Sequence, residues 1–363
     1  MFYINGTQKA PGQNPAIEKT RRARHTAQSV VRKKCSHCHQ VSSPSGAPAV
    51  RTQPKKRAKL RPAVVAGVAA ALLMLLILVA PLGLPVVIHW PDRRPIGMLF
   101  LASYRHSSAT NPRGWFNDPA LNVVGADGAD RFRTALLAYA DRSIGILKRI
   151  GAQGVLVWDL EGEQFPHKTT FIGDPRLLGR LAPEMEPVAD EFFARFRRAG
   201  FRVGLTVRPQ QLVFDADEFP RQEGVFNLKR SLLAKIDYAR TRWQASLFYI
   251  DSNGGIRRPD EAWQLRSLAA ERPDVLLIPE HHDLLYSSFS GPYFNLRRDP
   301  GALSAAKAAR FFGQSFRVLD IGDATNDLAT IANAHGHGDI LLFRAWYWNR
   351  DCDLLDRLTP PKP

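Results

Sequence analysis

Cysteine is scarce in this chain of 363 residues, and acidic residues are almost missing from its first sixth. The three cysteines are Cys35, Cys38 and Cys352, so the part of the chain between residues 95 and 351 has no internal disulfide to stabilise it. Residues 1–62 contain 14 lysines and arginines but only one acid, Glu18. Roughly +13 of the formal net charge of +16 therefore lies in this segment, and the rest of the chain is close to neutral.

Motifs for several large function classes are also missing. No Gly-rich nucleotide loop follows the first predicted strand, and the chain has neither a P-loop nor a serine nucleophile elbow. The high pI comes from the first 62 residues, and the remainder lacks a basic face with interleaved aromatic residues. We therefore expect no nucleic-acid partner and no cofactor.

Charged residues are absent from residues 63–88, a stretch longer than the about 20 residues needed to cross a bilayer. This predicts a transmembrane helix over residues 63–90, with Trp90 as an interfacial anchor. Basic residues precede it and little net charge follows it, so the positive-inside rule predicts a single-pass protein of the cell membrane with a cytoplasmic N-terminus. The lipid bilayer is thus one expected partner, and the domain after residue 90 is expected to be periplasmic or extracellular.

The basic tail, residues 1–62, is poor in apolar periodicity and is predicted to be disordered and to lie on anionic lipid. It contains Cys35-Ser36-His37-Cys38-His39. This run matches the C-x-x-C-H signature of haem attachment, although that chemistry needs the outer compartment. The two cysteines and the two histidines are alternatively zinc ligands, or a chance grouping, because no second ligand pair follows at finger-like spacing.

Short apolar runs alternate with longer helical patterns from residue 95 onward, which is typical of repeated βα units. Seven strands are predicted, at residues 96–102, 154–159, 202–207, 247–251, 275–280, 315–320 and 339–344. Helices are predicted between them, at residues 130–150, 184–199, 227–242, 259–272, 302–312 and 326–335. Gly151, Gly200 and Gly313 stand where helix C-caps are expected.

The alternation predicts an α/β fold, a (β/α)8 TIM-like barrel over residues 95–351 followed by a C-terminal tail, residues 352–363. The barrel either has its eighth strand around Tyr286–Phe289 or is incomplete, with seven strands. Two acids, Asp251 and Glu280, each close an apolar run where a barrel strand would end. Because the carboxyl ends of barrel strands converge on one face, these acids are expected to flank one substrate bond.

Other polar and aromatic residues follow the predicted strands in the same way. Aromatic rings stack on sugar rings while carboxylates and arginines bind hydroxyls, so this mixture favours a polysaccharide or oligosaccharide site. We expect seven residues to bind substrate there: Trp158, Asp159, Glu161, Arg208, Asp320, Arg344 and Trp346.

Residues 95–351 resemble the glycoside-hydrolase-like TIM barrels, most strongly over residues 157–167 and 172–175. The run Phe248-Tyr249-Ile250-Asp251 is similar to the fourth-strand nucleophile motif of retaining barrel glycosidases of the alpha-amylase and alpha-galactosidase types, although Tyr249 stands where the amylase type has an arginine. The resemblance implies Asp251 as nucleophile. It implies Glu280, at the end of the fifth strand, as general acid, and the galactosidase type, whose acid follows the sixth strand, nominates Asp320 instead. We rank Glu280 first.

These roles predict a membrane-anchored glycoside hydrolase that uses two carboxylates on a cell-surface or extracellular polysaccharide. Two other functions remain open. Glu280-His281-His282-Asp283 would suit a metal-dependent glycan hydrolase or deacetylase, although consecutive histidines point in different directions. The barrel would alternatively be an inactive glycan-binding or envelope scaffold, because fold alone does not entail catalysis.

Overall fold

The structure is a computed structural model that describes residues 70–71, 88–167, 172–253, 260–281, 284–295, 315–321 and 328–346. The predicted tails, residues 1–62 and 352–363, lie outside these residues, as do Cys35 and Cys38. So does the predicted transmembrane segment, apart from residues 70–71 and 88–90. No helix within the described ranges is long and apolar enough to cross a membrane.

Eight parallel strands form one sheet whose spatial order follows the chain, as in a TIM barrel. They are β1 (Ile96–Phe100), β2 (Gly154–Val157), β3 (Arg202–Val207), β6 (Leu247–Ile250), β7 (Leu276–Pro279), β8 (Tyr293–Asn295), β9 (Val318–Asp320) and β10 (Ile340–Trp346). The sheet edges are β7 and β8, and the amide of Gly291, just before β8, donates to the carbonyl of Leu277 in β7 at 3.0 Å. The barrel is therefore nearly closed, which confirms the predicted barrel.

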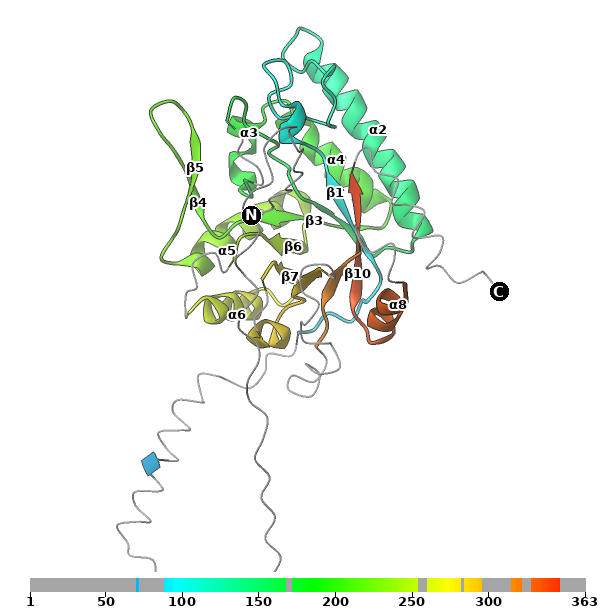
Figure 1. Ribbon diagram of the computed structural model, residues 1–363, viewed down its shortest axis with the longest axis vertical. Coiled ribbons are helices and arrows are strands. Elements are labelled where there is room, and N and C mark those ends of the chain that lie inside the picture. Colours follow the sequence, from blue (N-terminus) through cyan, green and yellow to red (C-terminus); the bar gives the residue numbers. More distant parts are fainter. Residues whose placement is uncertain are drawn as a thin grey trace, which may run out of the picture. The chain divides into compact units, whose positions relative to one another are not determined.

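Helices cover the outside of the strands (Figure 1). They are α2 (Gly128–Arg149), α3 (Leu178–Leu181), α4 (Glu186–Arg198), α5 (Leu228–Trp243), α6 (Glu261–Glu271) and α8 (Leu328–Gly336), with 3-10 helices η2 (Tyr104–His106), η3 (Pro175–Leu177) and η4 (Leu284–Ser288). Gly151 and Gly200 have φ of +62° and +87° just after α2 and α4, as predicted for C-caps. Gly313 and the predicted helix at 302–312 lie outside the described residues.

Neither alternative for the eighth strand is correct, because the sheet has eight strands and the eighth is not at Tyr286–Phe289. That segment belongs largely to η4, and the strand is β8, a few residues later. Ser288 Oγ donates to the Leu285 carbonyl and Ser290 Oγ to the Tyr286 carbonyl, both at 2.7 Å. These serine hydroxyls pair with backbone carbonyl groups of the turn, so the segment is stable without the partners that an extended strand would need.

A hairpin, β4 (Gln211–Phe214) and β5 (Pro220–Glu223), leaves the barrel directly after β3 and projects away from it (Figure 1). Its two strands pair antiparallel in a sheet of their own. The sequence patterns had indicated only a connection between β3 and the next helix.

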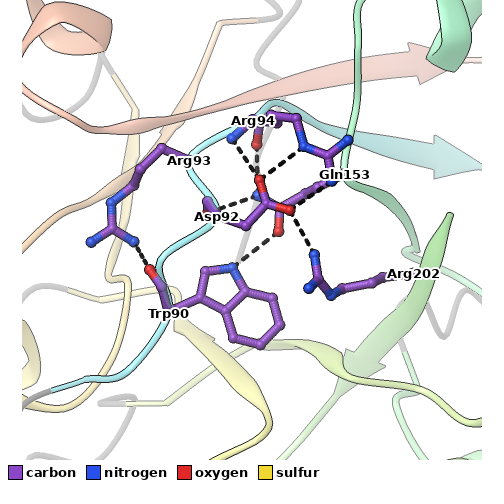
Figure 2. A network of polar contacts seen from close by, with 6 residues as sticks. All are labelled: Trp90, Asp92, Arg93, Arg94, Gln153 and Arg202. Carbon is purple, nitrogen blue, oxygen red and sulfur yellow. Dashed lines mark hydrogen bonds and ion pairs between the residues drawn. The ribbon is translucent and has the colours of Figure 1, made fainter.

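The segment before β1 is fixed to the end of the barrel where the strands begin (Figure 2). Trp90 is 6 % exposed, and its indole Nε1 donates to Gln153 Oε1 at 3.0 Å. The side-chain amide of Gln153 donates in turn to the carbonyls of Asp92 and Arg94, and Arg202 binds Asp92 at 2.7 Å. Trp90 is therefore part of the barrel floor, which contradicts its predicted place at a membrane interface.

Candidate active site

Asp251 and Glu280 follow two neighbouring strands at the same level. Strands β6 and β7 pair in parallel with Ile250 opposite Pro279, and the Glu280 amide donates to the Ile250 carbonyl at 3.1 Å. The acids are 1 % and 7 % exposed. The two carboxyl groups are near enough for the charge of Asp251 to act on Glu280. The two residues that the sequence singled out as a pair thus meet at the carboxyl ends of adjacent barrel strands.

Arg208 holds the carboxylate of Asp251. It follows β3, the strand next to β6, and its Nε and Nη2 both lie 2.5 Å from Asp251 Oδ2. Both side chains are largely buried. An arginine with two donors on one carboxylate oxygen fixes the position of that group and places a positive charge beside it. Arg208 was predicted as a substrate-binding residue, and the structure places it against the first of the two acids.

Backbone and amide groups hold Glu280. The amide of Ser252 donates to Glu280 Oε2 at 2.8 Å, and Asn253 Oδ1 accepts from the Glu280 amide at 2.8 Å. Ser252 has φ of +57°, a left-handed conformation that is costly for a residue with a Cβ. Asn253 donates to Tyr286 Oη at 3.3 Å. The turn after β6 therefore positions Glu280 through a strained residue, Ser252, and through the buried side-chain amide of Asn253.

The pKa of Glu280 is raised to about 7, first by burial and then by the charge of Asp251 beside it. Like charges at short distance cannot both ionise easily, so the second acid of such a pair keeps its proton to higher pH. Near neutral pH the pair is thus poised between holding one proton and none. That is the state a general acid needs in order to give a proton and later accept one.

Asp159 and Trp158 follow β2, and both side chains are buried in contacts with other parts of the protein. Asp159 accepts the amides of Leu101 and Ala102 at 2.8 and 2.9 Å, which ties the end of β1 to the end of β2. Burial raises the pKa of Asp159 to about 7. The Trp158 ring is 1 % exposed and packs on Phe100, with centroids 5.1 Å apart. The predicted sugar-stacking surface of Trp158 is therefore covered by protein.

Glu161 belongs to a buried charge cluster with Asp174 and Lys235. Burial, and then the nearby charge of Asp174, raise the pKa of Glu161 to about 7. Lys235, on α5, donates to the carbonyls of Arg208 and Gln210 at 2.7 and 2.6 Å and lies 3.6 Å from Asp174. The cluster fixes the backbone on both sides of the turn after β3. It therefore supports Arg208, and the sequence analysis did not identify Asp174 or Lys235.

Asp320 and Arg344 form a second buried group, on the strands that complete the barrel. Asp320 Oδ2 accepts from Tyr293 Oη, from Asn295 Nδ2 at 3.0 Å and from Arg344 Nη2. Arg344 also donates to Tyr293 Oη at 2.8 Å. Because β8 precedes it, Asp320 ends the seventh strand. The interpretation that gave it a sixth-strand acid role is therefore wrong in its strand count.

The remaining predicted residues are only partly described. Trp346 ends β10, where its backbone pairs with Phe100. His281 is half exposed, with Nε2 3.7 Å from Glu280 Oε2, and His282 and Asp283 lie outside the described residues. In the parts of the chain that the structure describes, no three His, Cys, Asp or Glu side chains are grouped as metal ligands.

Solved structures similar to this chain include an alpha-amylase and an alpha-L-fucosidase, both at low sequence identity. An alpha-amylase from Geobacillus thermoleovorans, complexed with acarbose, is 10 % identical, with a TM-score of 0.46 over 74 % of this chain and 78 % of that one. Alpha-L-fucosidase isoenzyme 1 from Paenibacillus thiaminolyticus is 12 % identical, with a TM-score of 0.42 over 75 % and 74 % of the chains. No family model matches the chain, and no curated protein matches it in sequence.

The resemblance to glycoside-hydrolase-like barrels that the sequence indicated is thus found again among solved structures, as a distant likeness. Likeness at this level concerns fold. What the protein does has to be inferred from its own side chains.

Proposed function

We propose that this protein is a retaining glycoside hydrolase in which Asp251 is the nucleophile and Glu280 is the general acid and base. The observation that carries the proposal is the placement of two buried carboxyl groups at the ends of adjacent paired strands, one held by an arginine and the other with a pKa raised to about 7. Retaining enzymes separate these groups by about 5 Å and inverting enzymes by about 6.5–9.5 Å, which leaves room for a water molecule. Neighbouring strands lie about 4.8 Å apart, so two carboxyl groups that follow paired residues of adjacent strands favour the retaining route.

In the first step, a carboxylate oxygen of Asp251 attacks the anomeric carbon as the glycosidic C–O bond breaks, and Glu280 gives its proton to the leaving oxygen. In the second, Glu280 takes a proton from water as that water attacks the anomeric carbon, and Asp251 is released as a carboxylate. Arg208 keeps Asp251 in position, and the Ser252 amide stabilises Glu280 as an anion between the steps.

The test is a screen of the full-length protein against cell-surface polysaccharides and aryl glycosides, with Asp251→Asn and Glu280→Gln beside it. We expect cleavage by the wild type, losses of at least about 1,000-fold in each variant, and release of the sugar with its anomeric configuration kept. Glu271→Gln, on the exposed face of α6, is the matched control and should cleave normally. Cleavage that survives both site variants would refute the roles, and binding without cleavage would favour a glycan-binding scaffold.

We further propose that the enzyme is anchored by the uncharged run at residues 63–88 and acts on a polymer near the membrane, because a tethered hydrolase reaches surface glycans first. The support is the uncharged apolar run and the basic residues before it. Membrane fractionation of the full chain, compared with a chain that begins at residue 88, tests this. Equal recovery of both in the soluble fraction would contradict it.

A further inference from the structure

Tyr249 lies directly beneath the two acids, inside the barrel. Its neighbours in β6, Phe248 and Ile250, pack outward with the helices, so Tyr249 and Asp251 share the inward face of the strand. In the parallel pairing Tyr249 lies beside Ile278, and Glu280, directly after β7, is the next inward residue. The Tyr249 side chain is thus adjacent to both acids and is 0 % exposed.

Two aromatic side chains fix the Tyr249 ring. Trp158 packs on it with centroids 4.3 Å apart, and Tyr293 meets it edge-on at 5.3 Å and 90°. Contacts of this kind hold an aromatic ring in one orientation. The hydroxyl therefore cannot turn freely toward a partner elsewhere in the barrel.

The hydroxyl of Tyr249 has no hydrogen-bond partner among the described residues. A buried hydroxyl left unpaired costs about 1–3 kcal/mol, and a phenylalanine would pack in the same place without that cost. Burial and then the charges of Glu280, Tyr293 and Asp251 raise the pKa of Tyr249 well above its ordinary value, whereas Arg344 acts in the opposite direction. The phenol thus keeps its proton, and Glu280 is the charged neighbour that affects it most.

From this geometry we propose that the Tyr249 hydroxyl is a reserve hydrogen-bond donor for Glu280, which engages the carboxylate once Glu280 has given up its proton. This positioning role rests on the proposed function. Such a donor stabilises Glu280 as an anion more than as an acid, so it assists proton donation to the leaving oxygen. The Ser252 amide already donates to Oε2 of Glu280, so the Tyr249 hydroxyl would be a second donor to the same carboxylate.

Other ionisable groups lie around Tyr249 and Glu280, so the test has to remove the Tyr249 hydroxyl without changing any of them. Asp251 follows β6, Arg208 follows β3, and His281 follows Glu280 itself. Tyr293 and Arg344 contribute from β8 and β10. Tyr249→Phe removes only the hydroxyl and keeps the ring between Trp158 and Tyr293, and none of these charges is deleted.

The experiment is a carboxyl titration by 13C NMR of the full-length protein labelled at glutamate, with Glu280→Gln to assign the Glu280 signal. We expect Tyr249→Phe to raise the pKa of Glu280 by about one unit, because the anion loses a donor. Tyr238→Phe, on the helical layer, is the matched control and should leave the titration unchanged. Thermal unfolding should show Tyr249→Phe at least as stable as wild type.

An unchanged or lowered pKa of Glu280 in Tyr249→Phe would overturn the inference. The titration needs no substrate, so its outcome is independent of the glycan screen. A shift without any glycan cleavage leaves the hydrogen bond established and refutes only the proposed function, whereas cleavage without a shift refutes only the role of Tyr249.

Discussion

Glu280 combines burial, a like-charged neighbour and one donor on its carboxylate, and these set the pH at which it acts. Its pKa of about 7 means that the proton is present below neutral pH and absent above it. In the proposed mechanism only the protonated form cleaves the glycosidic bond. The residue therefore gives the reaction an alkaline limit.

We expect the rate of glycan cleavage to fall about tenfold per pH unit above pH about 7, since Glu280 is then deprotonated. The measurement is kcat/KM between pH 5 and 9 for any substrate found in the screen. A profile that stays level to pH 9 would mean that Glu280 is not the acid.

Asn253 holds the backbone of Glu280 rather than its carboxyl group. It is fully buried, and its Oδ1 accepts the amide of Glu280. Asn253→Ala removes the shorter bond of that amide, which keeps only the Ile250 carbonyl, and it also removes the donor to Tyr286 Oη. We therefore expect the free energy of unfolding to fall by about 1–3 kcal/mol. Urea unfolding measures this. Asn122→Ala, in a loop where water replaces the lost bonds, should cost less than about 1 kcal/mol, and equal losses in the two variants would contradict the assignment.

At the scale of elements, helix α5 positions the turn after β3 through a single buried lysine. Lys235 satisfies two carbonyls of that turn and faces Asp174. Removing one member of a buried charge pair leaves the other uncompensated. The turn that carries Arg208, and with it the position of Asp251, thus depends on a residue of the outer layer.

Lys235→Met should lower the free energy of unfolding by about 3–5 kcal/mol, because two carbonyls lose their donor and Asp174 loses a cation. Lys229→Met, on the same helix, removes an exposed ion pair with Glu271 and an exposed hydrogen bond to Ser267 and should cost less than about 1 kcal/mol. Both values come from urea unfolding. Similar losses in the two variants would show that the buried cluster has no special role.

Most elements were predictable because their apolar runs are bounded by glycines and polar residues. The seven predicted strands correspond to β1, β2, β3, β6, β7, β9 and β10. The eighth was misplaced because Tyr293-Phe294-Asn295 is too short to show alternation, whereas Leu284–Ser288 has apolar residues that a serine-stabilised turn also accommodates. The hairpin at 211–223 was missed because its strands are half exposed and follow β3 without a break.

Residues of the site were predictable only where the side chain itself suggests a chemical role, as a carboxylate does. Asp251 and Glu280 close apolar runs, so strand convergence alone brings them together. Ser252 acts through its backbone amide and Asn253 through a backbone contact, which composition does not reveal. Lys235 sits in a helical pattern where a charged residue indicates solvent. Asp159 was expected to face substrate, but its carboxyl group instead accepts hydrogen bonds from the two backbone amides that follow β1.

At the scale of the whole molecule, this barrel buries acids that hold their protons. Burial raises the pKa of Asp159 and Glu161 to about 7 and that of Glu163 to about 8, and Glu280 has a pKa of about 7. In the unfolded chain these groups titrate near about 4. Between these values the folded state binds more protons than the unfolded state, so each group makes the protein less stable as pH rises.

We therefore expect the free energy of unfolding to decrease steadily from pH about 5 to pH about 8, by up to about 1.4 kcal/mol per group and pH unit. Groups of opposite sign act outside this window: Asp92, with a pKa lowered to about 2, loses its contribution only at lower pH, and Lys235, with a pKa lowered to about 8, regains stability only above it. Urea unfolding at four pH values tests the trend. Glu163→Gln should flatten the upper part of the curve, because that acid holds its proton to the highest pH, and a stability that is level or rises toward pH 8 would mean that these carboxyl groups are ionised inside the barrel.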